Sequence, residues 1–179
     1  MEFNDLSDEI KDKIFLYLDY DDLCEIYELC SDHVNHITEY NCMIMAVQHG
    51  NLENMKWLLS HGHLMHEEIF FWAADRGDLT IMKWLLKNNC PWDLHTFSRA
   101  VINGNLDNMK WLHVNHCPWN TLTFGAAAVI TGDVVIIAWL FENRCPYDIK
   151  NGFRCMIDLE AMRWVRKNIP EFDKEIEYY

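Results

Sequence analysis

The sequence predicts an all-α protein: a small helical segment, residues 1–40, followed by a helical solenoid of about five short helix-turn-helix repeats, residues 41–179. The main observation is a period of 27, 27 and 28 residues. Four tryptophans and four glycines keep it: Trp57, Trp84, Trp111 and Trp139, with Gly50, Gly77, Gly104 and Gly132. A shared period of this length is typical of repeat architectures. The first forty residues lack the period, so we treat them as a separate part.

Residues 1–40 predict two or three short helices. Ile10, Ile14 and Leu18 are spaced by four residues, which places them on one face of a helix. Ser7 precedes this helix and can cap its free amides. The plainest interpretation is a helical cap that covers the first repeat.

The same segment also resembles an F-box, the module that attaches substrate receptors to a Skp-type adaptor in cullin-RING ubiquitin ligases. The positions that fall on the family pattern are Leu6, Glu9, Ile10, Ile14, Phe15, Tyr17, Leu18, Asp22, Leu23, Leu29 and Cys30. The chain departs from it at Ser7, where proline is usual, and at His33, where tryptophan is usual. The resemblance implies an adaptor-binding surface formed by Leu6, Ser7, Ile10, Ile14, Phe15, Leu18 and Leu23.

The repeat units fall at residues 41–66, 67–93, 94–120 and 121–148, with a degenerate, capping unit from about 149. Each unit predicts two helices and a turn. The glycine can take a positive φ, and the Asn or Asp that follows it can cap the second helix. Apolar residues lie on more than one side of the second helices, so each unit needs neighbours to bury them.

These units resemble ankyrin repeats. Residues 95–120, HTFSRAVINGNLDNMKWLHVNHCPWN, match the family's TPLH-like opening, glycine turn, leucine-rich second helix and closing asparagine almost throughout. The step is shorter than the ~33 residues of an ordinary ankyrin unit, and the deficit falls where the family places its β-hairpin fingers. The chain looks like the shortened, CPW-type ankyrin variety abundant in giant DNA viruses. That resemblance implies a role in the cytoplasm or nucleus of a host cell.

Charge distribution argues against nucleic-acid and membrane partners. Residues 1–40 hold 12 acidic and 2 basic side chains of the chain's 28 and 15, so they carry −10 of the net charge of −13. Binding to phosphates or anionic lipid requires a Lys/Arg patch instead. The stretch from Phe124 to Leu140 is apolar enough to suggest a membrane span, but Gly132 and Asp133 interrupt it at the repeat's turn.

The seven cysteines are an odd set, and the chain begins without a signal-peptide pattern, which predicts a reducing setting and no secretion. Cys90, Cys117 and Cys145 recur beside prolines. Stacked helices lie ~8–10 Å apart, whereas zinc holds sulfur at ~2.3 Å, so equivalent cysteines in successive repeats cannot bind one zinc ion together. We therefore expect these thiols to be compact core groups. We place His61 and its neighbours His63 and His66 on a surface turn.

Positions that differ between similar repeats are the best candidates for contact with a target protein, because packing does not fix them. The candidates come from the pairs before the turn glycines and from the first helices: Gln48, His49, Trp72, Asp75, Arg76, Arg99, Ile102, Asn103, Ile130 and Thr131. The recurring Trp92, Trp119 and Tyr147 either pack between repeats or form a recognition stripe, and their regularity favours packing.

The sequence contains no phosphate loop, zinc-protease motif or nucleophile elbow, so we predict no catalytic residues, metal or cofactor. We expect a protein-protein interaction adaptor: a substrate receptor of a Skp/cullin-RING ubiquitin ligase. Its N-terminal segment would bind the adaptor, and its repeats an unidentified target. The alternative is an ankyrin-type interaction scaffold or virion component without a ubiquitin-ligase link.

Overall fold

The computed structural model describes residues 36–60, 62–149, 156 and 158–172. This part of the chain is all-α, as predicted, with nine α-helices, one π-helical segment and no strand. The elements are α3 (His36–Gln48), α4 (Leu52–Ser60), α5 (Glu67–Arg76), α6 (Leu79–Lys87), α7 (Leu94–Asn103), α8 (Leu106–Val114), α9 (Thr121–Gly125), η2 (Ala126–Thr131), α10 (Val134–Glu142) and α12 (Leu159–Asn168).

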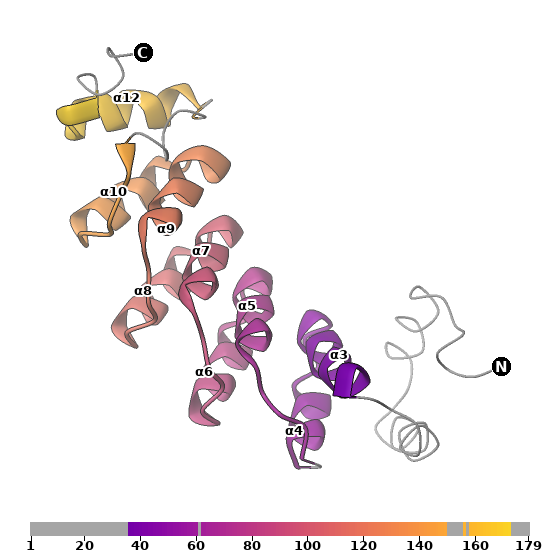
Figure 1. The fold of residues 1–179 in the computed structure, drawn as a ribbon. Helices are drawn as coiled ribbons and strands as arrows, with labels where there is room; N and C mark the ends of the chain where they lie inside the picture. Colours follow the sequence, from indigo (N-terminus) through magenta and orange to yellow (C-terminus); the bar gives the residue numbers. More distant parts are fainter. Residues whose placement is uncertain (1–35, 61, 150–155, 157, 173–179) are drawn as a thin grey trace.

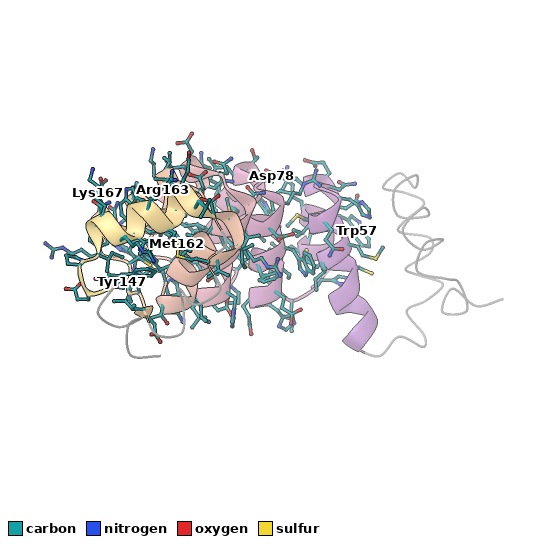
Figure 2. The ribbon with its side chains drawn as sticks, turned by 90° about the horizontal axis from the view of Figure 1, so that it is seen from above. Trp57, Asp78, Tyr147, Met162, Arg163 and Lys167 are labelled. Carbon is teal, nitrogen blue, oxygen red and sulfur yellow. The ribbon has the colours of Figure 1, made fainter. Side chains whose placement is uncertain are left out.

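Consecutive helices pair as hairpins that follow one another in a curved row from α3 to α12 (Figure 1). Helix α3 packs on α5, α5 on α7, and α7 on α9 and η2, so the first helices of the hairpins form one layer. The second helices α4, α6 and α8 pack on α3, α5 and α7, and α10 packs on η2 and α12. Trp57 of α4 and Met162 of α12 lie toward opposite ends of the row (Figure 2).

The glycine turns and polar caps agree with the sequence predictions. Gly77 and Gly104 have φ values of 75° and 82°, a left-handed conformation that glycine adopts without a Cβ clash. The side chain of Asp78 then accepts the amide hydrogens two and three residues further on. Asn105 and Asp133 cap α8 and α10 in the same way. Each turn therefore satisfies free amides at the start of the following helix.

The π-helical segment η2 accommodates the one extra residue of the 28-residue step. In α7 the amide of Gly104 donates to the carbonyl of Ala100, at 3.2 Å, four residues earlier. In η2 the amide of Gly132 donates to Ala127, at 2.9 Å, five residues earlier. The surplus residue therefore lies between Ala127 and Gly132, and within this stretch the side chain of Ile130 is 62% exposed. The extra residue thus widens one helical turn and leaves the glycine turn intact.

Aromatic contacts at the same period fill the core. Three phenylalanines have no exposed surface: Phe70, Phe97 and Phe124. Each contacts the aromatic residue near the end of its own unit, with ring centroids 4.9 Å apart for Phe70–Trp92, 5.0 Å for Phe97–Trp119 and 5.4 Å for Phe124–Tyr147. These contacts support the packing interpretation of the recurring aromatic residues over the recognition stripe.

The recurring cysteines are compact core groups, as expected. Cys90, Cys117 and Cys145 are buried, and their Sγ atoms lie 3.5, 3.9 and 3.7 Å from a carbonyl oxygen at the N-cap of a first helix. Burial raises the pKa of each thiol to about 12. These thiols are therefore protonated hydrogen-bond donors at neutral pH.

The prediction of a surface turn was wrong for His63, which is only 8% exposed. One repeat step back from Cys90 leads to His63, so the histidine occupies the buried cysteine position of its unit. The amide of His63 donates to the carbonyl of Leu58 at 3.1 Å, just as the amide of Cys90 donates to Leu85 at 3.0 Å. His66 is exposed, and His61 lies outside the described residues.

Candidate partner-binding surface

Four of the residues proposed from sequence variation gather on α5 and α7. The Nη1 atom of Arg99 lies 3.1 Å from Oδ1 of Asp75, and the Nδ2 atom of Asn103 donates to the backbone carbonyl of Asp75 at 2.9 Å. Trp72 stands on α5, three residues before Asp75. These contacts join two neighbouring hairpins, so the side chains belong to one surface.

Phe71 links the ion pair to Trp72. The guanidinium carbon of Arg99 lies 4.6 Å from the centre of the Phe71 ring, within the range of a cation–π contact. The rings of Phe71 and Trp72 are 5.3 Å apart and nearly perpendicular, at 85°. We did not select Phe71 from the sequence. Its position varies, with Ser98 and Gly125 in the next two units, and this variation was the available signal.

A groove of about 290 Å³ adjoins these rings, and we call it the aromatic–acidic groove. Its lining residues come from α5 and from the start of α7: Glu67, Glu68, Phe71, Trp72, Asp93 and His95. The two glutamates stand in the first turn of α5, where the helix dipole favours negative charge. Asp93 caps α7 by accepting the amide hydrogens of His95 and Thr96. Apart from Trp72, none of the lining residues was among the target-binding candidates.

The residues before the second and third glycine turns link the hairpins, because each covers the turn of the preceding hairpin. Arg76 donates through Nη1 to the backbone carbonyl of Gln48 at 2.7 Å, and its guanidinium covers Gly50. Asn103 covers Gly77 in the same way. His49 lies beside Gln48 in the covered turn and is half-buried. Arg76 and Asn103 therefore make structural contacts between hairpins in addition to the target-binding role proposed for them.

The remaining target-binding candidates lie apart from the aromatic–acidic groove. Ile102 is half-buried and packs against the core. Ile130 is exposed on η2, and the hydroxyl of Thr131 donates to the carbonyl of Ala127 at 2.9 Å. None of the three lines the groove.

The predicted adaptor-binding residues lie outside the described part of the chain: Leu6, Ser7, Ile10, Ile14, Phe15, Leu18 and Leu23. Helix α3 begins at His36 and runs through residue 41, where we expected the first repeat to begin. The adaptor surface therefore stays a prediction from the sequence.

The described residues contain no group of three or more His, Cys, Asp and Glu side chains placed to hold a metal ion. No helix among them is long and apolar enough to cross a membrane, and the stretch from Phe124 to Leu140 is divided between α9, η2 and α10. Comparisons with protein-family models, curated proteins and solved structures found no match to the chain.

Proposed function

We propose that this chain is a non-enzymatic substrate receptor of a Skp/cullin-RING ubiquitin ligase. The observation that carries the binding part of the proposal is the surface across α5 and α7, where an ion pair, two aromatic rings and a groove adjoin. Such a mixture of aromatic and charged groups is typical of protein-binding hot spots. The target protein would bind to this surface.

The same proposal assigns the described helices to an ankyrin-type solenoid with a capping unit at α12. The recurring local geometry supports this assignment. Left-handed glycines, polar caps and buried phenylalanines repeat at steps of 27 or 28 residues. Asparagine side chains also bond at 2.8, 2.8, 2.7 and 2.8 Å to the backbone carbonyl of the tryptophan four residues earlier, in the pairs Asn88–Trp84, Asn115–Trp111, Asn143–Trp139 and Asn168–Trp164. In stacked repeats each unit buries its apolar face against the next.

The N-terminal segment would bind the Skp-type adaptor, as its resemblance to an F-box implies. The receptor would then act by proximity. It would hold a lysine of the target near a ubiquitin carrier bound to the ligase, which raises the effective concentration of one reactant at the other. This mechanism needs two binding surfaces and no catalytic residue.

Co-purification with a recombinant Skp-type adaptor tests the proposal. The full chain is compared with a chain that lacks residues 1–35, so that the deletion ends before α3 begins at His36. We expect the full chain to bind the adaptor and the shortened chain to lose that binding while its thermal unfolding stays cooperative. Absence of adaptor binding by the folded full chain at micromolar concentrations would contradict the receptor proposal and favour an interaction scaffold or virion component.

A further inference from the structure

We infer that the aromatic–acidic groove binds a basic side chain, arginine or lysine, that the target protein presents. This inference rests on the proposed function, because it names the chemistry that the repeats recognise. Three properties of the groove support it: the charge of its lining, the two aromatic rings and its size.

The lining of the groove is negatively charged. Glu67, Glu68 and Asp93 contribute three carboxylates, and the lining residues include no lysine or arginine. Arg99 lies over Phe71, but it is paired with Asp75 at 3.1 Å, which balances its charge. A groove that concentrates charge of one sign attracts a ligand group of the opposite sign. A cationic group is therefore the complementary occupant.

The aromatic rings suit a cation as well. The negatively polarised face of an aromatic ring attracts ammonium and guanidinium groups, and tryptophan does so most strongly. The chain provides an internal example, because the Arg99 guanidinium lies 4.6 Å from the centre of the Phe71 ring. Trp72 adds a second ring to the same lining, at 85° to the first. The groove could hold a second cation by combining Trp72 with the nearby carboxylates.

The size of the groove fits one side chain better than a larger ligand. Its volume of about 290 Å³ lies at the lower end of the usual range of ~300–1,000 Å³ for small-molecule pockets. A nucleotide would also bring phosphates next to the three carboxylates, which would repel it. A single arginine or lysine side chain on a protein surface is small enough for the groove and carries a positive charge.

Nuclear magnetic resonance titration of the ¹⁵N-labelled full chain tests this inference. The probe is Nα-acetyl-L-arginine amide, and the control is Nα-acetyl-L-citrulline amide, which keeps the shape and removes the charge. We expect the arginine probe to shift the indole N–H resonance of Trp72 with a Kd on the order of millimolar, and citrulline to bind at least about tenfold more weakly. The variant Trp72→Phe identifies that resonance.

Two matched variants separate the groove from the general charge of the protein. Glu67→Gln with Glu68→Gln removes two carboxylates from the lining, whereas Glu142→Gln with Glu160→Gln removes two exposed carboxylates on α10 and α12. We expect the first pair to weaken arginine binding about tenfold and the second to leave it within about twofold. Melting curves followed by circular dichroism verify that both variants are folded.

Equal shifts with arginine and citrulline would overturn the inference, and this comparison needs no variant. Equal weakening by the two pairs of substitutions would overturn it too, because the attraction would then be non-specific. The adaptor co-purification is a separate readout. If adaptor binding is present and arginine binding is absent, the groove inference fails and the receptor proposal stands; the reverse result leaves a cation site on a protein with no ubiquitin-ligase link.

Discussion

At the scale of single residues, three side chains adopt a backbone conformation that favours glycine. Asn89, His116 and Arg144 have φ values of 58°, 63° and 62° just after a second helix, where the first unit has Gly62 with φ 88°. The left-handed region costs an L-residue about 1–2 kcal/mol, although asparagine tolerates it better than most.

We therefore expect Arg144→Gly to raise the free energy of unfolding by about 0.5–1 kcal/mol, since part of the relief is offset by glycine's larger entropy loss. The melting temperature should rise by roughly 1–4 °C. Arg144→Ala is the control, because it removes the same guanidinium and keeps the strain. Thermal unfolding by circular dichroism compares them, and identical melting temperatures would contradict the strain explanation.

The buried thiols make stability fall at alkaline pH. The pKa of Cys117 is raised by burial from its ordinary value of 9.0 to about 12 in the folded chain. Between these values the unfolded thiol loses its proton and the folded one keeps it, so rising pH lowers the free energy of the unfolded state relative to the folded state. The loss of stability above pH 9 is at most about 1.4 kcal/mol per pH unit for each such thiol.

Urea unfolding at pH 7.5, 9 and 10 measures this dependence. Lysines and tyrosines also titrate in this range, so the informative quantity is the difference between the wild type and Cys117→Ala. We expect the variant to be less stable at pH 7.5 and to lose less stability between pH 9 and pH 10. A parallel decline in the two proteins would show that the thiol does not contribute.

At the scale of the elements, η2 predicts that one residue can be removed from the fourth unit. Deletion of Ile130 restores the 27-residue step, removes an exposed side chain and lets the segment form an ordinary α-helix. We expect the free energy of unfolding of the Ile130 deletion variant to stay within about 1 kcal/mol of that of the wild type. Deletion of Ile102 in α7, which has no surplus residue, should destabilise the protein strongly because it shifts the following turn. Similar losses from the two deletions, measured by urea unfolding, would contradict this description of η2.

Neighbouring hairpins are coupled by a buried side chain on α8. Asn108 is only 2% exposed, and its Nδ2 atom donates to the carbonyl of Gly77 at 2.7 Å. Asn108→Ala should cost about 1–3 kcal/mol, because it leaves that carbonyl without this donor. Asn54→Ala on α4 changes the same helical position in the first hairpin, where the described chain has no preceding glycine turn to accept such a bond. We expect it to cost less than about 1 kcal/mol, and chemical denaturation compares the two.

At the scale of the whole molecule, a repeating sequence predicts the features that recur and misses those that depend on a neighbour. The all-α fold, the caps and the left-handed glycines follow from local chemistry repeated at each step. His63 was misplaced because its neighbourhood of histidines outweighed its register with Cys90. The aromatic–acidic groove was also missed. It combines Glu67 and Phe71 of α5 with Asp93 and His95 at the start of α7, and the packing of these two helices is not visible in the sequence of either one.

The most direct test of the receptor proposal is adaptor binding by a chain with Ile14→Asp and Phe15→Asp. The control is Ile130→Asp with Val135→Asp, which places the same charges on two exposed apolar positions of the repeats, 62% and 63% exposed. Binding to a Skp-type adaptor is measured by calorimetry at micromolar concentrations. The proposal predicts that the first pair abolishes binding and the second preserves it. Adaptor binding that survives Ile14→Asp and Phe15→Asp would contradict the assigned surface, and no binding by the wild type would contradict the receptor function itself.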